Sequence, residues 1–451
     1  MNSPMNRTLY LALMRLEDLA TGRHISRHYQ HLQRLKNADP EYLNEFRWNA
    51  LKRLLRHAYA NVPFYKKRFA AQEIHPEDIR SWADFAGIPP LTRADVKSQC
   101  DALISRLHAR EDLEVGETSG SSGTPMIFYY DNAAYSAGRA AVLTGWELAG
   151  KKLGDKLVTV WGGRHTVEER WPKWGSRFKA RLLRNKRIGA YALSDEHKIR
   201  EALDIISSRK GGFIHGYTNA LYMLATCAKD MDIAFEPRLD GVLTTSETLF
   251  PFQRRIIEDV FGPVYDGYGC LEILGIAFQC QEQKGYHIVE PNIIFEQEDC
   301  VDDRREIIVT DLWNYAFPLI RYKPGDLVMG ETSRSCACGC TWTTCEKIDG
   351  RATDIITAPD GTHIYYIIWY VATEVLDNHP HIKQFQWVKV EKNRLILRLQ
   401  VNYGDTKSIK DSVRYHVVPI LKGKMEFDIE FVDKFEIGPS GKHKPVVDET
   451  R

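Results

Sequence analysis

Residues 118–125 combine five hydroxyl side chains with two glycines, in the order Thr118-Ser119-Gly120-Ser121-Ser122-Gly123-Thr124-Pro125. Glycine lets backbone N–H groups approach an anion closely, and Ser and Thr hydroxyls add neutral donors that rotate toward phosphate oxygens. The segment lacks the lysine of a Walker loop, so an ordinary P-loop NTPase is disfavoured. A flexible polar surface loop is the alternative interpretation. We predict a phosphate-binding loop whose function depends on the motifs that follow it.

The nine cysteines are the second group of residues that could carry chemistry, because four of them fall within residues 336–345. An odd number of cysteines in a reducing compartment indicates a metal site or free thiols rather than a disulfide framework. Cys280 and His287 lie upstream of this segment. Thiolates and imidazole are the ligands that zinc prefers in tetrahedral structural sites. The pattern therefore predicts either a zinc site or free thiols.

The composition is that of an ordinary globular protein, with 43% hydrophobic residues, 27% charged residues and a formal charge of +1. The near-neutral charge provides no global field toward nucleic acid or an anionic membrane. The longest apolar run, residues 364–372, is much shorter than the roughly 20 residues that cross a bilayer, and the N-terminus has no signal-peptide pattern. We expect a cytoplasmic protein without a membrane span.

Residues 173–187 carry seven basic side chains and no acidic one. A nucleic-acid patch is one interpretation, but no recognition-module motif accompanies the segment, so a solvated helix face is favoured. The phosphates of CoA or of a carrier-protein arm would also suit this local charge. We expect no nucleic-acid partner.

Hydrophobic periodicity predicts the elements that position these groups. Apolar residues at three- and four-residue spacing predict helix over residues 27–71, with Asn61-Val62-Pro63 as a stop, inside a helical prelude of about 110 residues. Strands predicted at 156–161 and 241–245 alternate with helices predicted at 195–208 and 217–230. This alternation indicates a layered α/β architecture with several sheets.

The pattern changes at Ile348-Asp349-Gly350-Arg351. About 100 residues follow, with strands predicted at 384–390 and 395–399, and they are typical of a small separate α+β domain. We predict a large N-terminal domain over residues 1–348 and a smaller, mobile C-terminal domain over residues 349–451, with a hinge near residues 351–354.

Five further motifs follow the phosphate-loop segment in a fixed order. Each motif alone is weak evidence, because a residue such as Arg321 or Asp326 is more often a solvated turn charge or part of a salt bridge. The ordered set is the specific signal. Its members are Thr245-Ser246-Glu247, Tyr268-Gly269-Cys270-Leu271-Glu272, the segment Phe317 to Asp326, Asp349-Gly350-Arg351, and Gly438-Pro439-Ser440-Gly441-Lys442.

With these motifs the chain resembles the adenylate-forming superfamily, and within it the phenylacetate–CoA ligase-like branch that includes the CapK-type capsular polysaccharide proteins. The resemblance extends from about Asn61 to the C-terminal lysine, and residues 184–185, 216–225, 350–354 and 359–361 carry its CapK-like character. Such enzymes join a carboxylate to ATP, release pyrophosphate and pass the acyl-adenylate to a thiol or another nucleophile. The resemblance implies a large α/β adenylation domain and a mobile C-terminal lid.

The resemblance implies a role for each residue of the nucleotide site. Residues 118–124 would donate to the β- and γ-phosphates, and Glu272 would bind Mg²⁺, because a carboxylate is a hard oxygen ligand. Tyr268 would stack against adenine, with a core aromatic as the alternative, and Ser246-Glu247 would present backbone groups to the adenine edge. Gly269 would belong to the same ATP-binding segment. Asp326 would accept both ribose hydroxyls. Arg351 would hold nucleotide oxygens at the hinge.

The catalytic lysine implied by the resemblance is Lys442, with Lys444 as the rival. A mobile ammonium can reach the substrate carboxylate and the α-phosphate together when the small domain closes. A solvated lysine in a flexible tail is the alternative without the upstream motifs. Thr353 stands where many family members carry a hinge Asp, with Asp354 next to it. This departure puts the thioester half-reaction in question.

Related phenylacetate–CoA ligase-like sequences place a cysteine and histidine segment and a Cys-x-Cys-Gly turn at similar points. The resemblance therefore assigns Cys280, His287, Cys336 and Cys338 as ligands of a structural zinc ion, with Cys340 and Cys345 as substitutes. Four protein ligands leave no open position for a substrate.

The acyl pocket and the acceptor are the least specified parts of the site. By position, Trp161, His215 and Tyr217 would line the pocket, as would His165 and Phe213, and aromatic rings suit a flat or extended apolar acid. CoA is the simplest acceptor. The alternatives are an amine, a hydroxyl or a carrier-protein thiol, or a non-catalytic nucleotide-binding protein. We expect a monomer or a homodimer.

Overall fold

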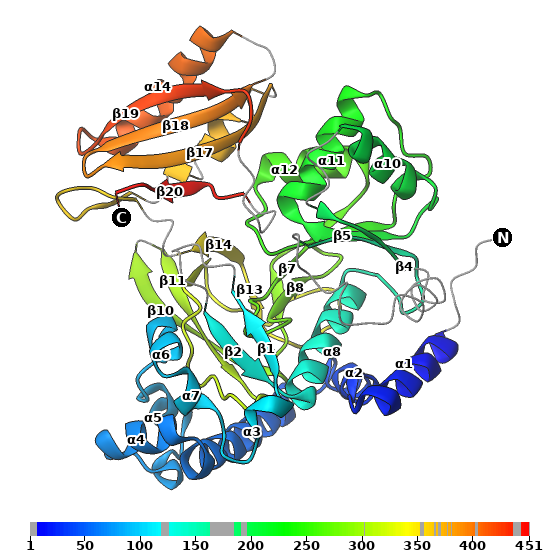
Figure 1. Cartoon of the computed structure of the whole chain (residues 1–451), viewed down its shortest axis with the longest axis vertical. Helices are drawn as coiled ribbons and strands as arrows, with labels where there is room; N and C mark the ends of the chain where they lie inside the picture. The colour runs from blue at the N-terminus through cyan, green and yellow to red at the C-terminus, as the bar shows by residue number, and fades with distance from the viewer. Residues whose placement is uncertain are drawn as a thin grey trace. The chain divides into compact units, whose positions relative to one another are not determined.

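The computed structural model divides into two compact units, each built from two separate stretches of chain. The first unit comprises residues 1–155 and 265–349, and the second comprises residues 156–264 and 350–451. The colour bar of Figure 1 locates these stretches along the ribbon. The structure describes residues 7–118, 126–162, 185–190, 196–301, 303–351, 356–364, 367–368, 371–376, 378–379, 381–401, 405–435 and 443–450.

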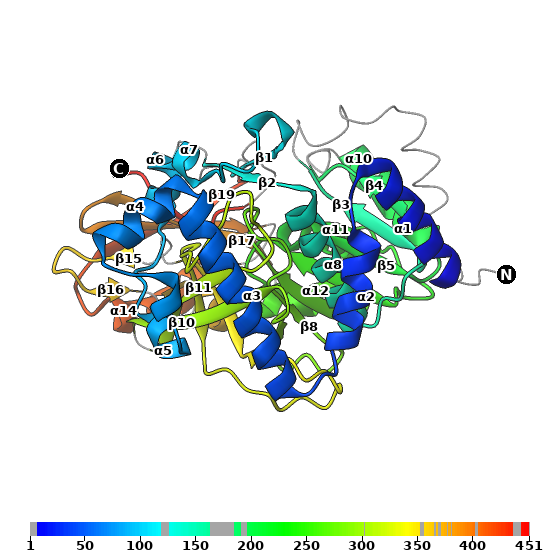
Figure 2. The same cartoon turned by 90° about the horizontal axis from the view of Figure 1, so that it is seen from below.

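Helices make up the N-terminal part of the first unit. They are α1 (Arg7–Thr21), α2 (Ile25–Leu35), α3 (Pro40–Asn61), α4 (Pro63–Ala71), α5 (Trp82–Ala86), α6 (Arg93–Ser98), α7 (Cys100–Leu103) and α8 (Asn132–Leu148), with short 3₁₀ turns η1 (Pro76–Asp78) and η2 (Arg110–Asp112). In Figure 2 the helices α2 and α3 can be followed along their length. The prediction of a stop at residues 61–63 is confirmed, because α3 ends at Asn61 and α4 begins at Pro63.

The prediction of continuous helix from residue 27 is wrong at residues 36–39, where α2 ends and α3 begins. Asp39 caps α3 by accepting hydrogen bonds from the backbone N–H groups of Glu41 and Tyr42, and Pro40 occupies the first turn. Asp followed by Pro is a strong helix-start signal, because the cap satisfies free N–H groups and Pro has none to lose. The apolar spacing on both sides of the break had masked this signal.

Three groups of strands complete the first unit. A hairpin pairs β1 (Glu114–Glu117) with β2 (Ile127–Tyr130), and a meander runs through β10 (Ile293–Val301), β11 (Arg304–Asp311) and β12 (Asp326–Met329). β14 (Lys347–Arg351) follows β12 in that sheet. The third group starts at β7 (Val264–Tyr268), which a loop connects to β8 (Ala277–Gln279). Strands β8, β9 (Tyr286–Ile288) and β13 (Thr344–Cys345) then pair antiparallel in that order.

One hydrophobic core joins helices α3 to α7 with strands of this unit. It packs Leu51, Leu54 and Leu55 of α3 with Phe317 and Tyr322, which lie between β11 and β12. Such residues are fully buried, so the motif segment 317–326 is anchored on both sides by apolar packing.

The second unit begins with a parallel sheet in the order β4-β3-β5-β6. Its elements are β3 (Leu157–Val160), β4 (Asn185–Ile188), α10 (Glu196–Ser207), β5 (Phe213–Tyr217), α11 (Thr218–Asp230), β6 (Gly241–Thr245) and α12 (Pro251–Val260). The predicted strands and helices of this region are confirmed to within a residue at each end. The carboxyl ends of parallel strands are the usual ligand-binding edge of such a sheet. Tyr217 and Ser246 stand at this edge.

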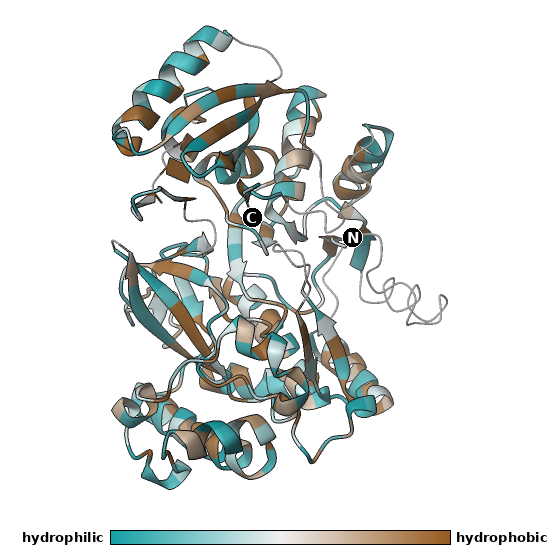
Figure 3. Ribbon diagram, turned by 60° about the vertical axis from the view of Figure 1, so that its left-hand side comes forward, coloured by the Kyte–Doolittle hydropathy of each residue, from teal (hydrophilic) through white to brown (hydrophobic). Residues whose placement is uncertain are grey.

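The C-terminal part of the second unit has its own sheet, in the order β19-β18-β17-β20. Its elements are β15 (Ile356–Thr357), β16 (His363–Ile364), η5 (Val371–Val375), β17 (Ile382–Glu391), β18 (Arg394–Val401), α14 (Thr406–Leu421), β19 (Glu426–Val432) and β20 (Val446–Asp448). Along β18, Leu395, Leu397 and Leu399 are buried and their neighbours are not, and Figure 3 shows the matching alternation of brown and teal along these strands. One face of this sheet is therefore a core face.

The prediction of an α/β fold with several sheets is confirmed. One boundary between the two units falls between Asp349 and Gly350, next to the predicted hinge. The division into a body over residues 1–348 and a mobile C-terminal domain stays a prediction. In the described part of the chain, no helix is both long enough and apolar enough to cross a bilayer.

Candidate active site and metal cluster

The loop after β7 joins two of the predicted nucleotide residues. The Tyr268 hydroxyl donates to Oδ2 of Asp326 over 2.8 Å, where Asp326 is the first residue of β12. Burial raises the pKa of the Tyr268 phenol, and the nearby Asp326 charge raises it further, so the phenol stays a neutral donor. The loop turns tightly at Gly269, where a Cβ atom would lie 3.0 Å from the backbone nitrogen of Gly275. Tyr268, Gly269 and Asp326 thus form one rigid corner.

Glu272, the predicted magnesium ligand, is a buried carboxylate with two fixed donors. Its Oε1 accepts from the Tyr322 hydroxyl over 2.8 Å and from Nη1 of Arg93 over 2.9 Å. The Glu272 side chain is 2% exposed, whereas the Arg93 side chain is 38% exposed. Glu272 also lines a cavity of about 140 Å³, together with Leu271 and Asp311. The carboxylate is therefore held in place while solvent-sized species can approach it.

The ends of the predicted phosphate loop are closed by hydrogen bonds. The Thr118 N–H donates to the Met126 carbonyl over 3.0 Å, and the Met126 N–H donates to Oγ1 of Thr118 over 3.1 Å. The hairpin register continues this closure, with Glu117 opposite Ile127. The other predicted donors, Ser119 to Thr124, lie outside the described residues.

Sequence reasoning missed Arg93 and Tyr322, the two groups that hold Glu272. Tyr322 lies within the motif segment 317–326, so its motif was recognised but not its role. Arg93 is the first residue of α6, whose N-cap is Thr92. Only the tertiary fold brings Arg93 to Glu272, which is 179 residues away in the sequence.

Arg321 forms a salt bridge, which was the alternative interpretation of this residue in the sequence. Its side chain is 8% exposed and pairs with Glu296 at 3.1 Å, and it also donates to the carbonyls of Ala86 and Ile88. These contacts tie the loop before α6 to the β-meander. Arg321 therefore supports the placement of Arg93 rather than contacting a ligand.

The second unit holds the remaining predicted nucleotide residues. Ser246 has a positive φ of 72°, a strained conformation for a residue with a side chain. The Glu247 carboxylate accepts from the backbone N–H of Asn219, at the start of α11, over 2.8 Å and from that of His443 over 2.9 Å. A carboxylate at a helix N-terminus is also favoured by the helix dipole. Glu247 therefore links α11 to the chain next to Lys442.

The structure describes only one of the two predicted catalytic lysines. Lys442 lies outside the described residues. Lys444 is exposed, and its carbonyl accepts from the Gln386 side chain over 3.0 Å. Arg351 lies in the last position of β14.

Three aromatic rings predicted for the acyl pocket lie together in the second unit. The Trp161 ring stacks on His215 with centroids 5.3 Å apart and an interplanar angle of 17°, and it lies 4.5 Å from the Tyr217 ring. Pairing of β3 with β5 sets this arrangement, because Thr159 lies opposite His215. The three rings form one aromatic cluster at the carboxyl end of these strands. His165 lies outside the described residues.

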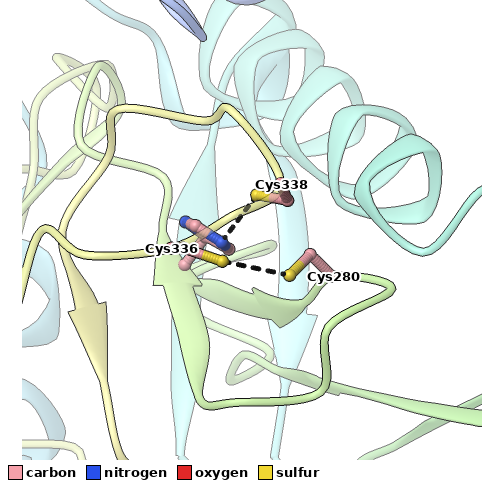
Figure 4. Close-up of side chains that lie close together, drawn as sticks. Cys280, Cys336 and Cys338 are labelled. Atoms are coloured by element: carbon pink, nitrogen blue, oxygen red, sulfur yellow. Dashed lines mark hydrogen bonds between the residues drawn. The ribbon is translucent and has the colours of Figure 1, made fainter.

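The four predicted zinc ligands converge in the first unit. The ligand atoms of Cys280, His287, Cys336 and Cys338 all lie within 4.8 Å of one another. The Cys280 and Cys336 sulfurs are 3.6 Å apart, and Figure 4 shows them beside Cys338. Nε2 of His287 is 3.3 Å from the Cys338 sulfur. Sulfur ligands around a tetrahedral zinc ion, with Zn–S bonds of about 2.3 Å, lie about 3.8 Å apart. The donor set and its spacing therefore fit zinc.

The protonation of His287 also fits metal binding. Its Nδ1 lies 3.3 Å from the Trp342 carbonyl, which can only accept, so Nδ1 carries the hydrogen and Nε2 presents its lone pair to the cluster. Burial lowers the pKa of His287 and raises the pKa of the Cys280 thiol to about 12. A bound cation would favour the thiolate again. Within the described chain, Cys340 and Cys345 are not part of this cluster.

Comparison with known proteins gives the same assignment as the motifs. Protein CapK of Staphylococcus aureus is 24% identical over 433 residues, which cover 94% of this chain and 92% of CapK. The phenylacetate–coenzyme A ligase of Aromatoleum evansii is 25% identical over 342 residues, which cover 72% of this chain and 74% of that protein. No family model matches the chain.

Solved structures show the same fold. 2-Hydroxyisobutyryl-CoA ligase, in the postadenylation state in complex with R3-HIB-AMP, superposes with a TM-score of 0.74 over 93% of this chain and 92% of that chain, at 19% identity. The anthranilate CoA ligase AuaEII, in complex with anthranoyl-AMP, gives a TM-score of 0.53 over 75% and 67%, at 14% identity. At these identities the likeness establishes the fold.

The fold matches that of a CoA ligase solved with an acyl-adenylate, and distant homologues cover most of the chain, in agreement with the resemblance that the motifs predicted. Its distant homologues over most of its length include CapK and the phenylacetate–coenzyme A ligases.

Proposed function

We propose that the chain catalyses the ATP-dependent adenylation of a carboxylic acid and then transfers the acyl group to CoA. The observation that carries this proposal is the convergence of Tyr268, Glu272, Asp326 and Arg93 beside Thr118 within one unit. These are the residue types that a site for a nucleoside triphosphate requires. They offer a metal ligand, an acceptor for the ribose hydroxyls and donors to the phosphates. The named CoA ligases among the homologues support CoA as the acceptor.

In the first step a carboxylate oxygen attacks the α-phosphorus of ATP, and pyrophosphate leaves. The step needs positive charge around the phosphates, because a carboxylate is a weak nucleophile and the leaving group is strongly negative. Mg²⁺ supplies part of this charge when it is bound, and Glu272 would hold it. Asp326, fixed by the Tyr268 hydroxyl, would accept the ribose hydroxyls.

Lys442 would bind the substrate carboxylate and the α-phosphate, and Glu247 would restrain the chain beside it through the N–H of His443. The aromatic rings of Trp161, His215 and Tyr217 would form one wall of the acyl pocket. Such a wall favours a planar acid over a charged or highly branched one. The zinc ion, held by Cys280, His287, Cys336 and Cys338, would be structural.

The test is ATP–pyrophosphate exchange over a panel of aryl, hydroxyaryl and short aliphatic acids, followed by product analysis with CoA present. We expect exchange with a subset of planar acids, and an acyl-CoA product with the same acids. Exchange without an acyl-CoA product would point to an amine, a hydroxyl or a carrier-protein thiol as the acceptor. Absence of exchange with every acid would contradict adenylation.

A further inference from the structure

The predicted phosphate loop has one chemical deficit, which is that it carries no cation. Residues 118–125 offer hydroxyl and N–H donors but neither Lys nor Arg. Neutral donors orient phosphate oxygens, whereas a guanidinium also compensates their charge and can bind two oxygens at once. A triphosphate site of this kind therefore needs a basic side chain from elsewhere in the fold.

Arg93 is the basic side chain that the fold brings to the start of this loop. Its Nη1 donates to Oε1 of Glu272 over 2.9 Å, and its Nη2 lies 3.5 Å from Oγ1 of Thr118. A guanidinium has five N–H donors, so these two contacts leave donors for a ligand. The Arg93 side chain is 38% exposed, so a ligand can reach it.

The position of Arg93 is set by structure on both sides of it. Thr92 caps α6 through a capping box with Asp95, which fixes the backbone at Arg93. The backbone on the other side is held because the Leu91 N–H donates to the Arg321 carbonyl over 2.8 Å and the Lys323 N–H donates to the Leu91 carbonyl over 2.9 Å. The backbone that carries the Arg93 side chain is therefore fixed before a ligand arrives, so that only the side chain has to be ordered on binding.

The charges around Arg93 show why a cation is needed there. Glu272 and Asp326 both contribute negative potential at the guanidinium. Two carboxylates and one Mg²⁺ ion would together be neutral, so they would offset little of the triphosphate charge. Adding Arg93 makes the set positive, and magnesium binding to Glu272 would compete with the guanidinium for the same carboxylate.

We propose that Arg93 binds the β- and γ-phosphates of ATP, taking the place of the lysine that the loop lacks. The inference rests on the proposed function, since it assumes that ATP is the nucleotide. In this account the guanidinium turns from Glu272 toward the phosphates when magnesium ATP binds. Arg93 is thus a ligand-binding residue, and the pair that it forms with Glu272 is its resting position.

Nucleotide binding without any acid tests this inference, because it does not depend on turnover. Calorimetric titrations would compare magnesium ATP with AMP for the wild type, R93Q, R93K and the control R110Q. Arg110 is also an exposed arginine of the first unit, and its guanidinium pairs with Asp101 at 2.9 Å rather than with Glu272. AMP has the adenine, ribose and α-phosphate but lacks the two phosphates that Arg93 is proposed to bind.

We expect R93Q to weaken magnesium ATP binding at least about tenfold and to change AMP binding less than about twofold, since one charge-assisted contact is lost. R93K should weaken ATP binding by a smaller factor because it keeps the charge but loses the fork. R110Q should bind both nucleotides like the wild type. If R93Q does not fold, the ratio of the ATP affinity to the AMP affinity is measured with R93K instead.

Two results would overturn the inference. Equal loss of ATP and AMP binding in R93Q and R93K would mean that Arg93 only supports the site through Glu272, and unchanged ATP binding would mean that it has no role in binding. A wild-type chain that binds neither nucleotide would contradict the proposed function itself, and the inference with it.

Discussion

Tyr268 offers two different surfaces at the candidate nucleotide site. Its hydroxyl is committed to Asp326, whereas its ring face is the surface proposed to stack on adenine. The hydroxyl therefore fixes both the ring and the carboxylate that would accept the ribose. A single hydrogen bond of this kind contributes roughly 1 kcal/mol, and more when one partner is charged.

Tyr268→Phe should raise the KM for ATP about tenfold and leave the KM for the acid within about twofold, because only the ribose acceptor loses its anchor. Steady-state kinetics with each substrate varied in turn would measure both constants. A change confined to the acid KM would contradict the placement of adenine and ribose at this corner.

The residues of the site differ in how far the sequence predicts them. Glu272, Asp326 and Tyr268 were predicted because each lies in a short motif whose residue types match a ligand. Arg93 and Tyr322 were not, because their role depends on packing between segments separated by 179 and 50 residues. Arg321 shows the converse, since a charge within a motif proved to be a buried structural contact.

At the scale of elements, the cysteine-rich segment 336–345 is a clamp on the turn between α2 and α3. The Trp342 ring N–H donates to the Leu35 carbonyl over 3.1 Å, and the Thr341 hydroxyl donates to the Ala38 carbonyl over 2.7 Å. The buried Glu290 carboxylate extends the clamp, because it pairs with Arg47 of α3 and with Arg334, both at 2.9 Å. A structural zinc ion would therefore hold the N-terminal helices as well as its own loop.

Glu290→Gln should destabilise the first unit by about 3–5 kcal/mol, because it leaves two guanidinium groups without their carboxylate at a buried site. Glu77→Gln is the matched control, since its pair with Arg56 is exposed and should contribute little to stability. Urea unfolding followed by tryptophan fluorescence would measure both variants. Equal effects would show that Glu290 does not secure the clamp.

The purified chain should contain stoichiometric zinc, measured by elemental mass spectrometry. Cys336→Ser and Cys338→Ser should lose most of the metal, whereas Cys300→Ser should keep it, because Cys300 is exposed and outside the cluster. Chelation should lower the midpoint of thermal unfolding, since the metal stabilises only the folded clamp. Full zinc content in both ligand variants would exclude this ligand set.

The elements themselves were largely predictable, because long periodic helices and apolar strands carry strong local signals. Strand β6 and helix α11 match their predictions to within a residue. The break at residues 36–39 was missed because it is specified by the cap of Asp39 and Pro40 and secured by contacts from Thr341, which is distant in sequence. Periodicity does not contain such tertiary information.

At the scale of the whole molecule, the fold matches that of 2-hydroxyisobutyryl-CoA ligase over 93% of the chain, including both units. The resemblance to the adenylate-forming superfamily assigns the adenylation step to the C-terminal lysine. The proposal therefore separates the roles of Lys442 and Lys444.

Lys442→Ala should lower acid-dependent ATP–pyrophosphate exchange by at least about a hundredfold, because the substrate carboxylate and the α-phosphate lose a shared cation. The same variant should keep most of its rate of acyl-CoA formation from supplied acyl-adenylate. Lys444→Ala is the control, since Lys444 is exposed and should affect exchange less than about threefold. The opposite pattern would move the catalytic role to Lys444.

The most direct test of the central claim is the fate of the carboxylate oxygen. An acid that supports exchange would be labelled with ¹⁸O in its carboxylate and converted with ATP and CoA, and the AMP and pyrophosphate would be analysed by mass spectrometry. Attack of the carboxylate on the α-phosphorus, followed by attack of the thiol on the carbonyl carbon, predicts one ¹⁸O atom in AMP and none in pyrophosphate. AMP without label would contradict carboxylate adenylation.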